Sequence, residues 1–527
     1  MKRVLSAGPL LRLLLFALLG VLVLTSCARL PPASAATSAT SATSATTKAS
    51  ATTGLPKATG LPTPAGPAET HIVLFHSNDV HGRIDAFAKV KTILDAEKKG
   101  GADVFYVSAG DNFTGDPVID RYDPPGEPML ELLGRLGLAV VCPGNHEFDY
   151  GLGTTRRFAS RFPMVSANIE APEGVFPELR PWTVLKTKNG TSIVVFGLIQ
   201  IEPENGLPST HPDKVKDLRF REPLAKALEM KGLRDKGQVL VALTHIGHDQ
   251  DLLLARRMPE IDVIIGGHSH TRVDPAVTVN GVLVAQAGSG NFYLGRIDLR
   301  LRDGRVIEKQ GRLIDLGQAR DEDASIKAMV AEYRRNPALS RVLAKAPLEI
   351  SGMNALGSLM TDAIRRTHSL DIAFQNNGGI RVGRLPKIIT LRDAYTLDPF
   401  GNQVVEIAMT PTEIRGLIKA SFEKRGDIDL QVSGITYVVR TDGTPRVREI
   451  LLRLPDGAPL PEDRTYKVGL SSYIASSYSF VHQDPGRSLQ TTTVDDLIDY
   501  LEKGADLGLY RDVLRAVWEK APAPSGN

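Results

Sequence analysis

The stretch that decides the fold is HIVLFHSNDVHG at residues 71–82, where an apolar run ends in a cluster of polar side chains. The run from Ile72 to Phe75 is short and partly β-branched, which predicts a buried strand. Asp79 and His81 follow this strand directly, and a helical pattern then occupies residues 86–98. A strand, a polar cluster and a helix in this order are typical of α/β folds, which build their sites at the carboxyl ends of strands.

The same alternation continues along the chain. We expect further strands at residues 104–107, 139–141, 192–198, 239–243 and 263–265, a helix at 128–136 and a hairpin at 294–307. A charged helical connector is expected at 321–343. Beyond it, helices are expected at 356–366, 411–424 and 494–502, and strands at 372–374, 404–409 and 466–470. A length of 527 residues exceeds what one hydrophobic core supports, so two folded domains are expected.

Five predicted strands end in residues that could bind a metal ion. The segments are Asp79-Val80-His81-Gly82, Gly110-Asp111-Asn112, Gly144-Asn145-His146-Glu147-Phe148-Asp149, Thr244-His245-Ile246-Gly247-His248 and Gly266-Gly267-His268-Ser269-His270. Asp, Asn and His are the ligands that borderline divalent cations prefer. Side chains at i and i+2 of a strand share a face, so Asp79/His81 and His268/His270 are each expected to point as a pair at one centre. One such motif would be weak evidence, but five in succession predict a metal site.

These motifs resemble the signature of the calcineurin-like metallophosphoesterases, and residues 144–149 resemble its 5′-nucleotidase/UDP-sugar hydrolase branch. The resemblance runs from about His71 to the end of the chain. It implies a layered α/β metallophosphoesterase domain at 71–318 and a helical connector at 319–346. A smaller mixed α/β 5′-nucleotidase C-terminal domain, which binds substrate, would occupy residues 347–521.

The resemblance also implies two divalent metal ions of the Mn, Zn, Co or Mg class. Carried over residue by residue, one ion would be held by Asp79, His81, Asp111 and His270. The other would be held by Asp111, Asn145, His245 and His268, with Asp111 bridging the two. The family often has Gln where His270 stands, and an imidazole also ligates metals. Two cations roughly 3.5–4 Å apart can activate a water and neutralise charge on a phosphoryl group, so in-line phosphoester hydrolysis is expected.

His146 and Asp149 are three residues apart, which suits an imidazole oriented by a carboxylate. In the family this dyad stabilises the transition state or protonates the leaving group, a general-acid role. A helix N-cap is the structural alternative for Asp149. His248 is interpreted as a structural or supporting residue rather than as a ligand.

The second predicted domain contains Asn376-Asn377-Gly378-Gly379-Ile380-Arg381. Its glycines let backbone amides approach an anion, and an arginine grips a phosphate with two hydrogen bonds. This segment resembles the family's substrate loop, with Asn376 and Arg381 at the binding positions. Phe400 and Tyr473 fall where the family has the two halves of an aromatic clamp around a nucleobase, and ordinary packing is the alternative for both.

The chain departs from the family pattern at two places that matter for substrate. Where nucleotidases usually carry an Asp that holds the ribose hydroxyls, this sequence has Ser479. A family arginine for the substrate phosphate is absent, and Gly352 stands near its place. Both departures weaken the prediction that the substrate is a nucleoside monophosphate more than they weaken the prediction of phosphoester cleavage.

The N-terminus predicts export. A basic start at Lys2 and Arg3, an apolar stretch and Leu24-Thr25-Ser26-Cys27 are typical of a secretory signal over residues 1–26 and resemble a bacterial lipobox with Cys27 as the lipidated residue. Residues 27–70, rich in Ala, Ser, Thr and Pro, are expected to form a disordered tether. We therefore expect a cell-envelope lipoprotein, held at the membrane by its lipid and facing the periplasm or the outer surface. Simple secretion is the alternative.

The charge of the chain limits its possible partners, and its cysteine content limits its possible disulfides. The formal charge is +3, and removing residues 1–26 with their three basic side chains leaves a neutral protein, which argues against a nucleic-acid polymer as partner. The chain has two cysteines, so a lipidated Cys27 leaves no internal disulfide, and Cys142 is expected to be a buried thiol.

The function expected from these features is hydrolysis of a small phosphorylated substrate, most of all a 5′-nucleotidase reaction outside the cytoplasm. A cyclic-nucleotide phosphodiesterase, a UDP-sugar hydrolase and a thiosulfohydrolase-like enzyme are alternatives on the same scaffold. A lipoprotein that binds a phosphorylated ligand without turnover is the alternative from a different class.

Overall fold

The computed structural model describes residues 69–203, 205–442, 446–511 and 513–520. The predicted signal sequence, nearly all of the predicted tether and the lipidation site Cys27 lie outside the described residues. The described residues belong to one compact unit that begins at Ala65. Among them, no helix is both long enough and apolar enough to span a bilayer.

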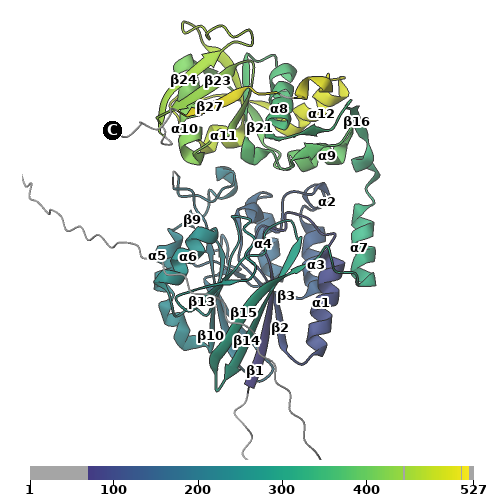
Figure 1. Cartoon of the computed structure of the whole chain (residues 1–527), viewed down its shortest axis with the longest axis vertical. Helices are drawn as coiled ribbons and strands as arrows, with labels where there is room; N and C mark the ends of the chain where they lie inside the picture. The colour runs from purple at the N-terminus through teal and green to yellow at the C-terminus, as the bar shows by residue number, and fades with distance from the viewer. Residues whose placement is uncertain (1–68, 204, 443–445, 512, 521–527) are drawn as a thin grey trace, which may run out of the picture. The chain divides into compact units, whose positions relative to one another are not determined.

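Two β-sheets form the centre of the first half (Figure 1). One contains β1 (Glu69–Ser77), β2 (Asp103–Ser108), β3 (Leu138–Val141), β4 (Met164–Val165), β6 (Leu179–Arg180), β14 (Tyr293–Arg302) and β15 (Arg305–Asp315), in the order β15-β14-β1-β2-β3-β4-β6. The other contains β7 (Trp182–Lys186), β8 (Ser192–Ile199), β10 (Val239–His245), β11 (Val263–Ile265), β12 (Val277–Val279) and β13 (Val282–Ala285), in the order β12-β13-β11-β10-β8-β7. A short pair, β5 (Ile169–Glu170) and β9 (Arg219–Phe220), lies apart from both sheets.

The two sheets pack face to face, because one hydrophobic cluster joins Ile72 and Leu74 of the first sheet to Val195 and Val241 of the second. The outer face of the first sheet is covered by α1 (Phe87–Lys99), α3 (Glu127–Leu136) and α4 (Leu152–Arg161), and that of the second by α5 (Pro223–Glu229) and α6 (His248–Arg257). Strands that are buried on both faces need continuous apolar sequence, which is what β10 has. This arrangement aligns the parallel strands β1, β2 and β3, and β8, β10 and β11, so that their carboxyl ends meet at one edge.

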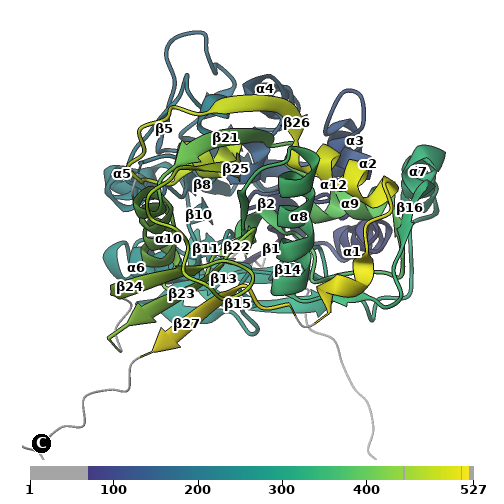
Figure 2. The same cartoon turned by 90° about the horizontal axis from the view of Figure 1, so that it is seen from above.

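The second half is a smaller mixed α/β structure (Figure 2). Its five-stranded sheet, in the order β22-β18-β25-β21-β26, consists of β18 (Ile372–Asn376), β21 (Gln403–Met409), β22 (Leu430–Ser433), β25 (Tyr466–Ser471) and β26 (Arg487–Thr492). A three-stranded sheet adds β23 (Thr436–Thr441), β24 (Val447–Arg453) and β27 (Ala516–Lys520), and two short pairs add β16 (Val342–Lys345), β17 (Ile350–Ser351), β19 (Arg384–Leu385) and β20 (Ile388–Thr390). The helices are α8 (Met353–Thr367), α9 (Leu391–Leu397), α10 (Pro411–Arg425), α11 (Ser472–Ser477) and α12 (Thr493–Glu502), and α2 (Pro117–Asp120) belongs to the first half.

The layered α/β half followed by a smaller mixed α/β half confirms the predicted fold class. The strands at β1, β2, β3, β8, β10 and β11 and the helices at α1, α3, α8, α10 and α12 lie where the sequence predicted them, within a few residues. Helices α4, α5 and α6 and the strands of the three-stranded sheet were missed. Helix α6 starts with the polar residues His248, Asp249 and Gln250, so its apolar periodicity was too short to predict a helix.

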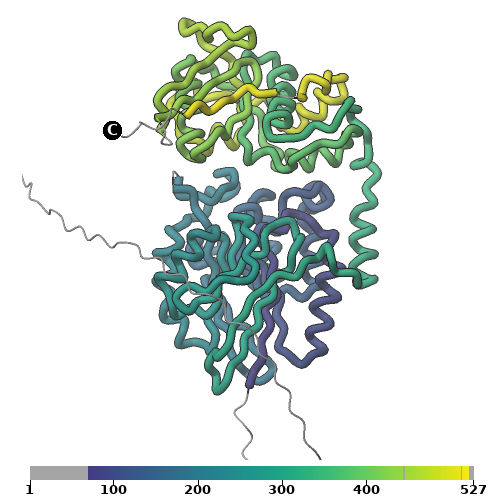
Figure 3. The backbone as a smooth tube through the Cα atoms, in the orientation of Figure 1, coloured from purple at the N-terminus to yellow at the C-terminus, as the bar shows by residue number. Residues whose placement is uncertain are grey.

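The prediction of a helical connector over residues 321–343 was wrong in its extent. Only α7 (Ala324–Arg334) is α-helical, and a short 3-10 segment, η4 (Pro337–Ser340), precedes the strand β16. The helix ends because Pro337 disfavours helical backbone at the residue before it, and Asn336 is extended with its side chain accepting from the amide of Ala338. Figure 3 follows the chain through α7 into the second half.

Candidate metal centre and adjoining cavity

The candidate ligands follow the carboxyl ends of five parallel strands. Asp79 and His81 come after β1, Asp111 after β2, Asn145 after β3, and His268 and His270 after β11, whereas His245 is the last residue of β10 itself. Asn145 and His146 begin a 3-10 segment, η1 (Asn145–Phe148). Since these strand ends share one edge, the fold brings together side chains that are up to 191 positions apart in the sequence.

The expectation that Asp79/His81 and His268/His270 pair on a strand face was wrong. These four residues lie in loops beyond the strands and hold left-handed backbone, with φ values of 50°, 50°, 78° and 55°. The direction of their side chains is therefore set by the conformation of the loops and not by the pleat of a β-strand. The ring of His268 faces Asn145, whereas the ring of His270 faces Asp79 and His81.

Three overlapping groups of possible ligand atoms result, one of them formed by His81, Asp111 and His146. Asp79 Oδ1 is 3.3 Å from His270 Nε2 and 3.9 Å from His81 Nε2, and these two imidazole nitrogens are 3.1 Å apart. Asp111 Oδ2 is 3.1 Å from His245 Nε2, which is 3.9 Å from Asp79 Oδ1. The ligand atoms of Asp79, His81 and His270, and those of Asp79, Asp111 and His245, lie within 4.8 Å of one another in each set.

Asn145 and His268 extend the last of these groups. Asn145 Oδ1 is 3.2 Å from His268 Nδ1, and its amide nitrogen donates to the carbonyl of Ser209 at 3.1 Å, which leaves the oxygen toward the cluster. The backbone amide of His268 donates to both carboxylate oxygens of Asp79, at 3.2 and 3.0 Å. All seven predicted ligands are thus brought to one place; five of them are buried, His268 is half-buried and His270 is exposed.

The donor set fits a cation. His245 Nδ1 donates to the carbonyl of Ala109 at 2.7 Å, which leaves Nε2, a fully buried atom, facing Asp111 Oδ2. At 3.1 Å from the Asp111 carboxylate, Nε2 needs positive charge beside it, either a proton of its own or a bound cation. Burial alone would lower the pKa of His245, but Asp111 and Asp79 raise it to about 10. The cluster therefore favours added positive charge, which a divalent ion supplies.

Glycines make room for this cluster. A Cβ on Gly144 would lie 2.2 Å from Asp111 Oδ1 and 2.7 Å from the ring of His245, and a Cβ on Gly267 would lie 2.7 Å from His245 Nδ1. Separations under 3.0 Å to such atoms require the ligands to move. The two positions explain why glycine precedes Asn145 and His268.

Glu147 fixes the loops that carry the ligands, and the sequence reading missed this role. Its fully buried carboxylate accepts from the backbone amides of Asp111 and Asn112 at 2.8 Å and of Gly144 at 2.6 Å. Burial and the Asp111 charge raise the pKa of Glu147, while these amide donors oppose the rise. The signal in the sequence was a Glu three positions after a glycine that precedes a helical turn, the spacing of a capping box.

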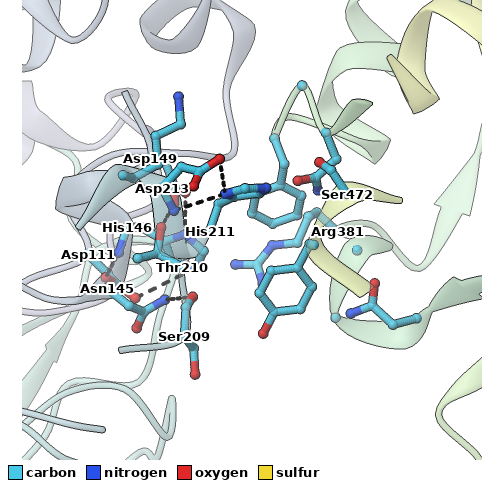
Figure 4. Close-up of a pocket in the computed structure, with 18 of the residues that line it drawn as sticks. Asp111, Asn145, His146, Asp149, Ser209, Thr210, His211, Asp213, Arg381 and Ser472 are labelled. Atoms are coloured by element: carbon cyan, nitrogen blue, oxygen red, sulfur yellow. Dashed lines mark hydrogen bonds and ion pairs between the residues drawn. The ribbon is translucent and has the colours of Figure 1, made fainter. Parts of the chain in front are cut away.

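His146 and Asp149 form the expected pair. His146 Nδ1 lies 2.6 Å from Asp149 Oδ2, and Thr210 donates its hydroxyl to Asp149 Oδ1 at 2.8 Å (Figure 4). His146 Nε2 is 3.9 Å from Asp111 Oδ2, so it faces the cluster. Burial lowers the pKa of His146, but the charges of Asp111 and Asp149 outweigh it and raise the pKa overall. Asp149 ends η1 rather than capping a helix start.

A cavity of about 750 Å³ opens beside this cluster. Figure 4 shows Asp111, Asn145, His146 and Asp149 on one wall and Arg381 and Ser472 on the other. All four predicted substrate residues, Asn376, Arg381, Phe400 and Tyr473, line it. One Arg381 Nη lies 3.4 Å from both ring nitrogens of His81, and the ring of Phe400 stacks on that of His146 at 5.7 Å and 26°.

The cavity also has walls that the sequence did not indicate. Ser209, Thr210, His211 and Lys214 of the first half line it, as does Arg425 at the end of α10. Ser479 is exposed and Gly352 caps α8, and neither belongs to the lining. His248 begins α6 and lies outside the cluster, with its amide donating to Ser269. Cys142 is buried, as predicted, and burial raises the pKa of its thiol.

Comparison with known proteins identifies both halves. The family model of calcineurin-like phosphoesterases matches residues 72–272, and that of the 5′-nucleotidase C-terminal domain matches residues 339–480. The 5′-nucleotidase precursor of Thermus thermophilus superposes with a TM-score of 0.73 at 25% identity, covering 86% of this chain and 100% of that one.

Two curated relatives are similar to this chain in sequence. A 5′-nucleotidase of Vibrio cholerae is 27% identical over 522 residues, which cover 84% of this chain and 92% of that protein. The trifunctional nucleotide phosphoesterase protein YfkN of Bacillus subtilis is 25% identical over 501 residues, which cover 82% of this chain. This chain spans only 34% of the length of YfkN.

Proposed function

Since the chain belongs to the family that joins a calcineurin-like phosphoesterase domain to a 5′-nucleotidase C-terminal domain, we propose that it is a metal-dependent hydrolase that releases phosphate from small phosphoesters, above all nucleotides. The observation that carries this proposal is the meeting of the seven candidate ligand side chains beside an imidazole–carboxylate pair. A protein that only binds a phosphorylated ligand has no need of such a pair.

In the proposal, two divalent ions of the Mn, Zn, Co or Mg class occupy the cluster. One would be held by Asp79, His81, Asp111 and His270, and the other by Asp111, Asn145, His245 and His268. The buried Nε2 of His245, which faces Asp111, and the space that Gly144 and Gly267 leave support this assignment. Bound there, the ions would activate water and offset the charge of the phosphoryl oxygens.

His146 is proposed as the group that hands a proton to the leaving oxygen. Asp149 accepts from Nδ1 and Thr210 holds the carboxylate, so the ring is fixed with Nε2 toward the reacting centre. The adjacent carboxylates favour the protonated ring, which is the form a general acid requires. Arg381, which is half-buried and close to His81, is proposed to hold the phosphoryl oxygens, with Asn376 beside it.

The rest of the cavity suits a flat organic group. Phe400 and Tyr473 line it, and a base stacked on aromatic rings gains about 1–3 kcal/mol regardless of its identity. Ser479, which stands at the position of the family's ribose-binding Asp, does not line the cavity, whereas Lys214 and Arg425 add positive charge to the lining. We propose that the enzyme accepts several nucleotides rather than requiring ribose hydroxyls, in keeping with relatives named for nucleotide phosphoesterase activity.

A panel of phosphoester substrates tests this proposal. The purified chain with added Mn²⁺ is expected to hydrolyse p-nitrophenyl phosphate, and kcat/KM across AMP, UDP-glucose, cyclic nucleotides and simple phosphomonoesters would rank the substrate classes. Phe400→Ala should lower kcat/KM for AMP about tenfold or more, since it removes a stacking ring, and change that for glycerol phosphate little. Failure of the wild-type chain to cleave any of these esters would contradict the proposal.

The remaining proposals concern location and domain boundaries. We propose that residues 1–26 direct export, that Cys27 carries a lipid and that 27–70 tether the catalytic part to the membrane. Residues 71–318, 319–346 and 347–521 are proposed as the catalytic domain, connector and substrate domain. Metabolic labelling with a fatty-acid analogue tests the anchor, because Cys27→Ser should abolish the label.

A further inference from the structure

A second cavity of about 260 Å³ reaches the candidate metal centre. It shares His270, Gly378 and Arg381 with the larger cavity, but it also touches His81, which the larger cavity does not. Asp111, Asn145, His146 and His268, in turn, line only the larger cavity. The ligand cluster is therefore accessible from two cavities rather than one.

The size of the second cavity excludes most substrates. Cavities that hold small organic ligands measure about 300–1,000 Å³, and one water takes up about 30 Å³ of liquid. A volume near 260 Å³ is too small for a nucleoside together with its phosphate, but it has room for a tetrahedral oxyanion and a few waters.

The lining favours an anion. Arg83 and Arg381 contribute two guanidinium groups, Ser289, Asn377 and Thr396 contribute polar side chains, and none of the described residues that line the cavity is acidic. The guanidinium of Arg83 stacks over the exposed ring of Phe292 at 5.3 Å. Within the described part of the chain, it makes no ion pair within 4.0 Å, so its hydrogen-bond donors remain available to a ligand.

We propose that the smaller cavity is a binding and exit site for the inorganic phosphate that the reaction releases, with Arg83 as its main contact. This inference rests on the proposed function. While the larger cavity still holds the organic product, the smaller one gives phosphate a separate route from the metal centre. Phosphate binds there as a tetrahedral oxyanion, and no bond forms or breaks in this step.

Product inhibition tests the proposal. With AMP as substrate and adenosine formation as readout, inorganic phosphate should inhibit the wild-type enzyme in two ways. It competes with substrate at the metal centre, and from the smaller cavity it also binds the enzyme–substrate complex. Arg83→Gln should raise the inhibition constant for the enzyme–substrate complex about tenfold, while the competitive constant and kcat/KM change less than twofold.

A matched control variant distinguishes the loss of a contact with phosphate from the loss of one positive charge elsewhere on the protein. Arg272 also stacks on an aromatic ring, Tyr293, at 4.4 Å, but it lines neither cavity. Arg272→Gln should leave both inhibition constants unchanged. Purely competitive inhibition of the wild type, or equal effects of the two variants, would overturn the proposal.

A direct measurement of phosphate binding distinguishes a failure of the phosphate site from a failure of the proposed function. Calorimetric titration of the metal-loaded protein with inorganic phosphate should show two binding events, of which Arg83→Gln loses one. Ser289→Trp, which fills the cavity, should lose the same event. If no ester is hydrolysed yet the Arg83-dependent event is present, the proposed function fails and the phosphate site stands. If both variants retain two events, the phosphate site is wrong.

Discussion

At the scale of single residues, the candidate ligands share an uncommon backbone conformation. Asp79, His81, Asp111, His268 and His270 all have φ between 50° and 78°. Non-glycine residues in this region cost of order 1–3 kcal/mol each and persist where the surroundings hold them. The amide of Asp79 donates to Gly110 and the amide of His81 to Asp111, so neighbouring loops fix one another in this conformation.

A substitution at Asp149 tests the role of His146. Asp149→Asn keeps the shape of the partner but removes the charge that favours a protonated imidazole. We expect kcat for AMP to fall about 10²–10³-fold, the size of a general-acid contribution. The loss for p-nitrophenyl phosphate should be much smaller, because nitrophenolate leaves without a proton.

Asp213→Asn is the control for this experiment. Asp213 also lines the larger cavity, but its side chain pairs with His211 rather than with His146. Its substitution should change neither substrate's kcat by more than about twofold. Equal losses for AMP and p-nitrophenyl phosphate in Asp149→Asn would contradict the general-acid role.

At the scale of elements, the turn between β3 and η1 decides whether the metal centre assembles. The φ of Gly144 is −94°, which any residue adopts, so only the close contact of its Cβ with Asp111 and His245 is at issue. Gly144→Ala is expected to lower the bound metal measured by plasma mass spectrometry by at least half. Circular dichroism should show that the fold is retained.

Gly153 in α4 provides the matched control, because nothing lies within 4 Å of its added Cβ. Gly153→Ala should keep the full metal content and raise stability by about 0.4–1 kcal/mol, through the smaller entropy of the unfolded chain. Normal metal content in Gly144→Ala would show that the turn tolerates a side chain and that the fit of this cluster is misjudged.

The second half depends on a polar network centred on Asp362 of α8. Its carboxylate accepts from Arg515 at 2.7 and 3.0 Å, from the hydroxyl of Tyr510 at 3.0 Å, and from Ser433. Removing one partner of a buried pair costs about 3–5 kcal/mol, and Arg515 is partly exposed, so Asp362→Ala should cost about 2–4 kcal/mol in urea unfolding. Asp499→Ala, which removes a surface pair with Lys503, should cost less than about 1 kcal/mol.

The same network predicts a pH dependence. Burial would raise the pKa of Asp362, but hydrogen bonds from Arg515 and Ser433 hold it below its ordinary value. A carboxyl group with a lowered pKa in the folded state contributes its stability above the unfolded pKa of about 4 and loses it as the pH falls further. The difference in unfolding free energy between wild type and Asp362→Ala should therefore shrink below about pH 4. A difference that stays constant from about pH 7 to about pH 3 would contradict this assignment.

At the scale of the whole molecule, sequence reasoning located the ligands far better than the cavity walls. The ligands follow apolar strand-forming runs, and the carboxyl ends of parallel strands meet wherever the sheet forms, so the order of motifs sufficed to bring Asp79, Asp111 and His245 together. Lys214, Arg425 and Arg83 carry no local signal, because they acquire a role only through loops and helices that meet in the folded chain. Helix patterns were recognisable where the apolar face was continuous, as in α1, and were missed where polar residues opened the helix, as in α6.

The same limit explains the wrong assignment of Asp79/His81 and His268/His270 to strand faces. Apolar runs mark where a strand is buried, but they do not mark the residue at which the ladder of hydrogen bonds stops. Here β1 ends at Ser77 and β11 at Ile265, and the ligands beyond them adopt left-handed backbone. The candidate ligands still meet in the structure because their loops turn back toward the same edge of the sheets.

The seven candidate side chains are proposed to bind a pair of divalent ions. The most direct measurement is the number of ions bound per chain, obtained by titrating the chelator-treated protein with Mn²⁺ and following binding by calorimetry. We predict two ions per chain for the wild type and a loss of both high-affinity events in Asp111→Ala, since Asp111 contributes to both sites. A wild-type chain that binds no divalent ion, or an Asp111→Ala variant that still binds two with unchanged affinity, would contradict the account.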